Sequence, residues 1–290
     1  MGLPKELLIF RRLYKNYIQV ILAYHRRDKL ISVTFRDGRK LNLDPDSIFL
    51  INRLIETGMD ESRAITCIED QTIPYKGHLL KIRGSETKGF TIYETFLRGD
   101  YKNLDVKDQT VLDVGGNIGD TAIFFLMNGA ARVILLEPYP TTFELAVENI
   151  KSNKLEDKVV LLNSSYGQDR ELVIDEFKIA NAGNSLEESE HGKKIREYSL
   201  KSLIEKFKIE NAVLKMDCEG CEYHLLREPD EWISTFTRIQ IEYHYGFVDL
   251  VSKLRSAGYE VEFTKPVRII NEHASNPIMS VGFIYAERKL

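Results

Sequence analysis

The stretch Val111-Leu-Asp-Val-Gly-Gly-Asn-Ile-Gly119 decides the fold of this chain. Apolar residues lead to an acid and a glycine-dense turn, and the helix-like run from Asp120 to Met127 follows. This order is typical of a buried strand, a tight turn and a helix. Glycines in such a turn let a ligand lie directly on the main chain, facing the N–H groups and the positive dipole end of the helix. The stretch therefore predicts a small-molecule site at the carboxyl end of a strand.

Strand-like apolar runs alternate with helical runs from residue 110 onward. The predicted strands cover residues 110–114, 132–136, 159–163, 212–216, 238–242, 260–263 and 280–287. The clearest helices between them cover residues 121–127, 141–153, 201–207 and 247–257. This alternation predicts an α/β fold with a doubly wound, mostly parallel, seven-stranded sheet. We expect the last two strands to pair antiparallel, because no helix connects them.

Residues 1–100 are predicted to form an α+β appendage, and residues 101–290 the main domain. An apolar stripe over residues 3–27 predicts a helix, Asp37-Gly38 predicts a hairpin turn, and residues 44–57 predict a second helix. Short strands are expected over residues 61–89. The apolar stripe fits packing against the chain's own core, but also a homodimer seam or a membrane-surface helix.

Composition and charge exclude several classes of protein. Hydrophobic residues make up 43% and charged residues 29%, as in ordinary globular proteins, and a net charge of -4 gives no general case for nucleic acid. No apolar run approaches the roughly 20 residues that span a bilayer. No small-residue cleavage site follows the basic N-terminus, so we predict no signal peptide. Three cysteines are too few for a disulfide framework, so we expect a reducing, cytoplasmic location.

Polar or glycine residues follow five successive predicted strands. In open α/β sheets ligands bind at the carboxyl ends of the strands, so these residues together describe a crevice, although each alone fits a solvated loop. They are Gly115, Gly116 and Asn117; Glu137; Ser164 and Ser165; Asp217, Glu219 and Glu222; and Glu242 and His244.

Glu137 lies 24 positions after Asp113, about the distance at which an acid meets a ribose in nucleotide-binding folds. Its two carboxylate oxygens can accept both ribose hydroxyl protons. The turn Gly115-Gly-Asn-Ile-Gly119 lacks the Gly-x-Gly-x-x-Gly register, which weakens an interpretation as an NAD or FAD site.

Four motifs resemble those of class I S-adenosylmethionine-dependent methyltransferases of the FkbM type. Asp113-Val-Gly-Gly-Asn-Ile-Gly-Asp120 resembles the first motif, and the run that begins Glu137-Pro-Tyr-Pro140 resembles the second-strand acid and its helix. Leu214-Lys-Met-Asp-Cys-Glu-Gly-Cys-Glu222 resembles the family's most specific signature, Lys-x-Asp-x-Glu-Gly-x-Glu, and Ile241-Glu-Tyr-His244 resembles its fifth-strand end. The resemblance covers about residues 90–287. Gly116 stands where alanine is usual, and cysteines occupy two of the three variable positions of the acidic signature.

The resemblance implies a Rossmann-like fold and S-adenosylmethionine laid across the first three strand ends. The residues that it implies for the methionine part are Asp113, Gly115, Gly116, Asn117, Gly119 and Asp120, with Glu94 and Tyr101 closing over that end. Glu137 would hold the ribose. Ser164 and Ser165 would hold the adenine edge, with Pro138 or Tyr139 against the adenine face.

We predict His244, Asp217, Glu219 and Glu242 as catalytic residues. His244 suits a general base that takes a hydroxyl proton, or a structural histidine bonded to Glu242 or Glu219. The acids after the fourth strand fit a helix N-terminus, a polar floor for a hydroxylated substrate, or a divalent-cation site. Of the last two we favour the floor without a metal.

Cys218 and Cys221 invite a zinc or redox interpretation. Zinc would need four ligands, and only His224 and His244 could join the two cysteines. A redox pair would need a thioredoxin-like context, which the pattern lacks. We therefore expect two thiols with neither function.

The predicted function is methyl transfer from S-adenosylmethionine to an oxygen of a small hydroxylated molecule, such as a sugar or glycosylated metabolite. The alternatives are an N-methyltransferase, an RNA-modifying methyltransferase that uses the N-terminal region for recognition, and a cofactor-binding scaffold without catalysis. Residues 168–198 predict a decorated hairpin or loop, which we expect to select the substrate together with a loop over residues 267–277. His273 lies in that second loop and receives no role.

Overall fold

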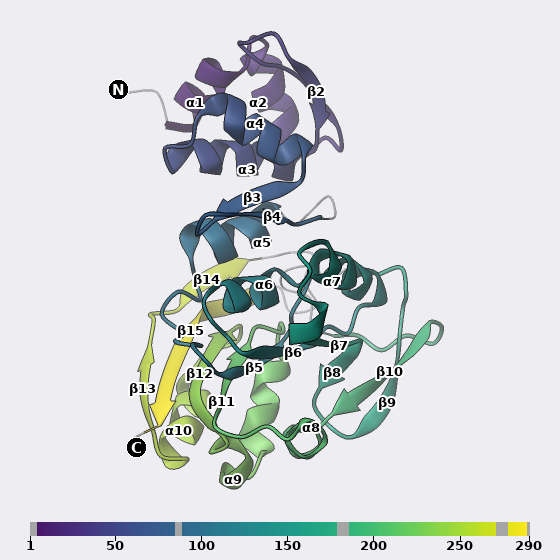
Figure 1. The fold of residues 1–290 in the computed structure, drawn as a ribbon, viewed down its shortest axis with the longest axis vertical. Helices are drawn as coiled ribbons and strands as arrows, with labels where there is room; N and C mark the ends of the chain where they lie inside the picture. Colours follow the sequence, from purple (N-terminus) through teal and green to yellow (C-terminus); the bar gives the residue numbers. More distant parts are fainter. Residues whose placement is uncertain (1–4, 85–88, 179–185, 271–277, 289–290) are drawn as a thin grey trace. The chain divides into compact units, whose positions relative to one another are not determined.

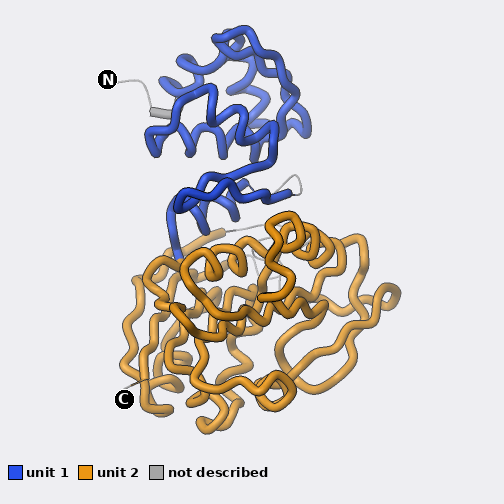
Figure 2. The backbone as a smooth tube through the Cα atoms, viewed as in Figure 1, with its two compact units in different colours: residues 1–100 blue, residues 101–290 orange. Residues whose placement is uncertain are grey.

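The computed structural model describes residues 5–84, 89–178, 186–270 and 278–288. The chain divides into two compact units, residues 1–100 and residues 101–290 (Figure 2). Each unit has a hydrophobic core of its own. In the described ranges we find no helix with the length and apolar content needed to cross a membrane.

The first unit begins with two helices, α1 (Lys5–Leu13) and α2 (Tyr17–His25), where we expected one. The helix is interrupted because the Asn16 side chain bonds to the strand β1 (Ile31–Thr34): its amide donates to the Ser32 carbonyl and its oxygen accepts the Thr34 N–H, each at 2.9 Å. The predicted hairpin of β1 and β2 (Lys40–Leu43) is confirmed, and Gly38 in its turn has φ +101°. Helix α3 (Pro45–Glu56) also forms as predicted, capped by Asp44.

Residues 61–89 only partly follow the expectation of short strands. Residues Glu61–Glu69 form a helix, α4, because the Asp60 carboxylate accepts the Arg63 N–H at its start. A hairpin of β3 (Thr72–Tyr75) and β4 (His78–Lys81) follows. The unit ends with α5 (Gly89–Ile92) and a π-helix, η1 (Tyr93–Arg98).

The second unit is built on one large sheet with the strand order β13-β15-β12-β11-β5-β6-β7, and β14 pairs with β15 (Figure 1). Its strands are β5 (Thr110–Val114), β6 (Arg132–Leu136), β7 (Val159–Leu162), β11 (Ala212–Met216), β12 (Phe236–Tyr243), β13 (Tyr259–Phe263), β14 (Val267–Ile270) and β15 (Ile278–Arg288). The five strands from β12 to β7 are parallel, and β15 is antiparallel to β12 and β13. The predicted doubly wound, mostly parallel sheet is therefore confirmed. Strand β14 is an addition, formed where we expected a loop, and residues 271–277, including His273, lie outside the described residues.

Helices cover both faces of this sheet, with α6 and α7 on one face and α8 and α10 on the other (Figure 1). The helices of this unit are α6 (Asp120–Met127), α7 (Pro140–Ser152), α8 (Leu200–Phe207), α9 (Asp230–Ile233) and α10 (Val248–Ser256). Between β7 and β11 the chain forms a small sheet of β8 (Ser164–Tyr166), β9 (Arg170–Ile174) and β10 (Lys193–Tyr198), which contains the predicted hairpin. The central strands are mostly apolar and buried on both sides, so their carboxyl ends are fixed relative to one another.

Candidate active site

The glycine turn lies tightly between the ends of β6 and β11. The N–H groups of Gly115 and Gly116 both donate to the Leu136 carbonyl, at 3.0 and 2.9 Å. Gly115 has φ +78°, and a Cβ at this position would lie 1.9 Å from the Asp217 carbonyl oxygen. Only glycine fits there, because both the backbone angle and the close approach exclude a side chain. Gly119, at φ +80°, then leads into α6.

Gly116 has a different reason to be glycine. A Cβ at Gly116 would lie 2.2 Å from Cγ of Leu135, a buried residue of β6. The leucine fills the space that an alanine methyl would need. The glycine at this position is thus explained by a neighbouring side chain.

A buried lysine, Lys215, contacts the glycine turn. The sequence analysis quoted it within the acidic signature but gave it no role. Nζ of Lys215 lies 3.0 Å from Oδ1 of Asp113 and donates to the Gly115 carbonyl at 2.7 Å. Burial lowers the pKa of Lys215, but the Asp113 and Asp217 carboxylates raise it by more, so it stays above its ordinary value. Asp113 also accepts the Thr121 hydroxyl at 2.5 Å. Asp113 is fully buried beneath the turn and fixes its shape.

Glu137 connects the ends of two strands. Its Oε2 accepts the Asn117 N–H at 3.0 Å, and its Oε1 accepts the Tyr139 N–H at 2.9 Å. The side chain is 3% exposed. The structure therefore holds the predicted ribose acid directly beside the glycine turn, with its carboxylate orientation fixed.

Three buried polar atoms lie at the end of β7 and the start of β8. Asn163 donates through Nδ2 to the Glu137 and Pro138 carbonyls, at 2.9 and 3.0 Å. Its Oδ1 and the hydroxyls of Ser164 and Ser165 are buried and have no hydrogen-bond partner among the described residues. Such atoms are rare in folded proteins and point to a missing partner. The sequence analysis selected both serines and missed Asn163, although its position at a strand end was a usable signal.

Tyr101 contacts the end of β11. Its hydroxyl donates to Oδ2 of Asp217 at 2.8 Å, and its ring lies 5.5 Å from Nζ of Lys215. Burial, followed by the Asp217 and Glu242 carboxylates, raises the pKa of Tyr101 well above its usual value. Glu94 belongs to the first unit, where its carboxylate pairs with Arg98 at 2.5 Å. Its role in cofactor binding stays a prediction.

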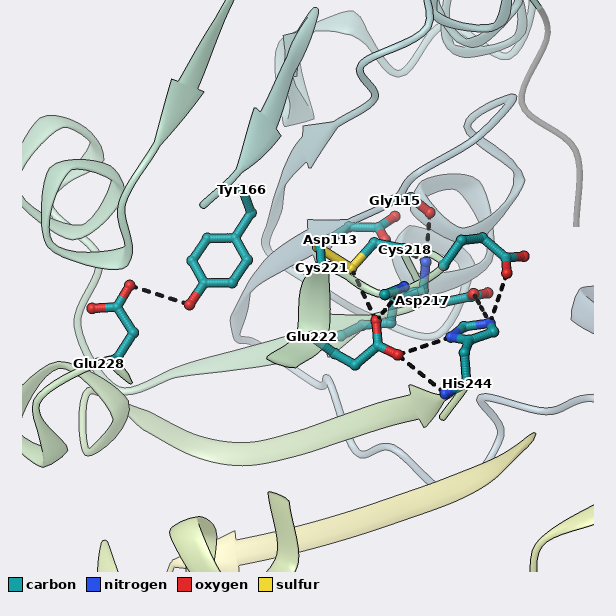
Figure 3. The surroundings of a disulfide bond; sticks show 12 residues. Asp113, Gly115, Tyr166, Asp217, Cys218, Cys221, Glu222, Glu228 and His244 are labelled. Carbon is teal, nitrogen blue, oxygen red and sulfur yellow. Dashed lines mark hydrogen bonds and ion pairs between the residues drawn. A yellow bond between two sulfur atoms is a disulfide. The ribbon is translucent and has the colours of Figure 1, made fainter. Parts of the chain in front are cut away.

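His244 is held by carboxylates on both sides of its ring (Figure 3). Nδ1 lies 3.0 Å from Oε1 of the fully buried Glu222, and the His244 backbone N–H donates to the same oxygen at 3.1 Å. Nε2 lies 3.1 Å from Oε2 of Glu219 and 3.9 Å from Oδ1 of Asp217.

These contacts affect the pKa of the imidazole. Burial lowers the pKa of His244, but Glu222, Glu219 and Asp217 raise it by more, and the pKa lies well above its ordinary value. The geometry holds the imidazole ring in a fixed orientation between carboxylates. The role of His244 as a general base stays a prediction.

Cys218 and Cys221 form a disulfide, so the expectation of two thiols is wrong (Figure 3). Glu219 at φ +55° and Gly220 at φ +119° turn the chain sharply and bring the two Cα atoms to 5.5 Å. The Gly220 N–H donates to Oε2 of Glu222 at 2.8 Å, and Sγ of Cys218 contacts this oxygen at 3.6 Å. The three-residue spacing of the cysteines was the signal for this bond. The disulfide thus closes the turn that carries Glu219, directly after Asp217.

Comparisons with known proteins agree with the motifs. The model of the methyltransferase FkbM domain matches residues 113–261. An uncharacterised protein, 158B, of Sulfolobus islandicus rod-shaped virus 1 is 32% identical over 125 residues, which cover 43% of this chain and 56% of the viral protein. A tRNA(Phe) (4-demethylwyosine(37)-C(7)) aminocarboxypropyltransferase of Pyrococcus horikoshii is 39% identical over 56 residues, or 19% of this chain and 20% of that enzyme. The matches therefore span about half and one fifth of these two relatives.

Solved structures give more distant likenesses. TYW2 of M. jannaschii in complex with AdoMet is 16% identical with a TM-score of 0.41, and covers 75% of this chain and 86% of its own. The precorrin-6y C5,15-methyltransferase of Geobacter metallireducens is 14% identical with a TM-score of 0.37, and covers 63% of this chain and 81% of its own. The family match rests on the sequence motifs and not on these structures.

Proposed function

This chain belongs to the FkbM methyltransferase domain family, and we propose that it transfers a methyl group from S-adenosylmethionine to a hydroxyl oxygen of a small hydroxylated molecule such as a sugar. The observation that carries the cofactor part is a set of buried polar atoms beside Glu137, at Asn163, Ser164 and Ser165, that have no partner within the described part of the chain. An amide oxygen can accept the adenine amino group, and hydroxyls can donate to its ring nitrogens.

The remaining residues fit the rest of the cofactor. Glu137 would accept the ribose hydroxyls, because a carboxylate oxygen can accept more than one hydrogen bond. The backbone from Gly115 to Gly119 and the start of α6 at Asp120 would hold the methionine part, with Tyr101 and Glu94 beside it. The cofactor supplies an electrophilic methyl group on a sulfonium.

The residues at the ends of β11 and β12 would receive the acceptor. Methyl transfer to oxygen depends mainly on in-line placement of the hydroxyl, to which fixed hydrogen-bond partners contribute. Asp217, Glu219 and Glu242 can accept hydrogen bonds from neighbouring hydroxyls, and one of these carboxylates would take the proton that leaves. His244, held by Glu222, would orient Glu219 and Asp217.

A small acceptor is favoured over RNA by the charge of this region. Carboxylates at the acceptor site repel phosphates, whereas RNA-binding surfaces neutralise phosphates with lysine and arginine. The net charge of -4 adds no general attraction for RNA. One relative acts on tRNA(Phe) according to its name, so RNA remains the second candidate.

Isothermal titration with S-adenosylmethionine tests the cofactor site. We expect Glu137→Gln to weaken binding roughly ten- to hundredfold, the range that loss of a charged hydrogen bond gives. Glu144→Gln, an exposed acid on α7, serves as the control and should bind like the unchanged protein. Equal affinity of both variants would contradict the assignment of Glu137.

Transfer of a labelled methyl group to a panel of sugars and to bulk tRNA tests the acceptor. Labelling of a sugar or glycoside is the expected result, and preferential labelling of tRNA would overturn it. Tight cofactor binding with no methyl transfer to any acceptor would favour the alternative of a cofactor-binding scaffold without catalysis.

A further inference from the structure

Three metal-ligating side chains converge at the ends of the neighbouring strands β11 and β12. Asp217, Glu242 and His244 each place one possible ligand atom within 4.8 Å of the others. Oε2 of Glu219 lies beside the same histidine nitrogen, at 3.1 Å. The group thus combines carboxylate oxygens with an imidazole and is more than a set of acids.

The ring of His244 is oriented as in many metal sites. Metal-binding histidines usually bond through their other nitrogen to a carboxylate, which fixes the ring. Here Nδ1 lies 3.0 Å from Glu222, a fully buried carboxylate, and Nε2 faces Asp217 and Glu219 (Figure 3). Tyr101 fixes Asp217 in the same way, because its hydroxyl binds Oδ2 while Oδ1 faces the histidine.

The separations are close to those of a bound ion. With metal–ligand distances of about 2.1 Å, two ligands of one ion lie at most about 4.2 Å apart. Atoms that lie within 4.8 Å of one another therefore need to move by only several tenths of an ångström. Side-chain rotation alone provides such a shift.

We propose that Asp217, Glu242 and His244 bind a divalent cation of the Mn²⁺ type, with Glu219 beside it. Carboxylates suit Mg²⁺ and Mn²⁺, whereas imidazole suits later transition metals, and Mn²⁺ accepts both. The imidazole would bind the cation through Nε2, because a metal-binding imidazole is in its unprotonated form. This replaces the metal-free floor that the sequence favoured.

The cation site does not depend on methyl transfer, but its role in catalysis rests on the proposed function. A cation here would bind the acceptor hydroxyl, orient it, and favour loss of its proton. Sugars carry adjacent hydroxyl groups, and two of them could bind the same cation.

The test measures binding of the cation alone, without the cofactor and without an activity assay. The full chain is stripped with EDTA and titrated with Mn²⁺, and electron paramagnetic resonance reports the free aqueous ion. We expect one saturable site per chain. We expect Asp217→Asn, Glu242→Gln and His244→Gln each to raise its dissociation constant at least tenfold, while Glu171→Gln, an exposed acid that pairs with Lys194, leaves it unchanged.

Circular dichroism and titration with S-adenosylmethionine accompany each variant. A variant that keeps its fold and cofactor binding but loses Mn²⁺ supports the site. If one variant fails to fold, the other two decide. No saturable binding, or equal Mn²⁺ binding by all folded variants, overturns the proposal. If the chain binds the cation but not S-adenosylmethionine, the result supports the cation site and contradicts only the proposed function.

Discussion

At the level of single residues, Lys215 shows how strongly one buried side chain can affect the stability of the fold. It is 1% exposed and neutralises Asp113, which is fully buried. Removal of one partner from a buried ion pair leaves an unpaired charge away from water. The free-energy cost of this unpaired charge is much larger than the net stabilisation that the ion pair gives relative to apolar residues at the same positions.

Lys215→Met should therefore lower the free energy of unfolding by about 3–5 kcal/mol. Urea unfolding followed by circular dichroism measures this loss. Lys194→Met provides the comparison, because its pair with Glu171 is exposed on both sides and should contribute almost nothing. Equal stability of the two variants would show that Asp113 does not need its lysine.

Gly116 gives a second test at a single position. Gly116→Ala should lower the free energy of unfolding by about 1–3 kcal/mol, because the new methyl group meets Leu135. Adding Leu135→Val removes part of the obstruction. The double variant should then be more stable than the sum of the two single changes predicts, as a double-mutant cycle in urea would measure. Simple additivity would contradict the packing explanation.

Single residues could be selected from the sequence where a polar side chain follows an apolar strand. Glu137, Asp217 and His244 were found in this way, and the structure holds each at a strand end. Lys215 was quoted within the acidic signature but received no role, because it lies within a strand and its partner lies on another strand. The pattern of one chain segment does not reveal such pairing.

The turn from Cys218 to Cys221 is the element that controls the acidic part of the site. Its disulfide closes a very short loop, and Gly220 and Cys218 both contact Glu222, the carboxylate that holds His244. The shape of this turn therefore affects the position of the imidazole.

Thiol counting in denaturant tests the disulfide. One thiol, that of Cys67, should react before reduction, and all three should react afterwards. Cys218→Ser combined with Cys221→Ser should lower the free energy of unfolding by about 2 kcal/mol, the entropy expected for so short a loop. Three reactive thiols without reductant would contradict the bond.

Elements were predictable where one repeating pattern covers them. The strands β5, β6 and β11 are mostly apolar runs, and they occur at the predicted positions. The break between α1 and α2 was not predictable, because Asn16 ends the helix by bonding to β1, a distant strand. Helix α4 was missed because its apolar face is short and only Asp60 marks its start.

At the scale of the whole molecule, the first unit carries one predicted cofactor residue, Glu94. A carboxylate near the methionine part would bond to its ammonium group. We expect Glu94→Gln to weaken binding of S-adenosylmethionine about tenfold or more in isothermal titration. Glu56→Gln, which changes another acid of the same unit that pairs with Arg53, should have no effect. If the two variants bind equally, residues 101–290 hold the cofactor without Glu94.

The bond from Lys215 to the Gly115 carbonyl joins positions 100 residues apart. During synthesis the ribosome adds about 5–20 residues per second, so the glycine turn waits roughly 5–20 s for its lysine. Strand β5 is complete early but has β11 as one neighbour in the sheet, so one edge of this apolar strand stays unpaired for that time. The nascent chain therefore passes through a stage at which the glycine turn lacks the bond from Lys215 and one edge of β5 lacks its partner strand.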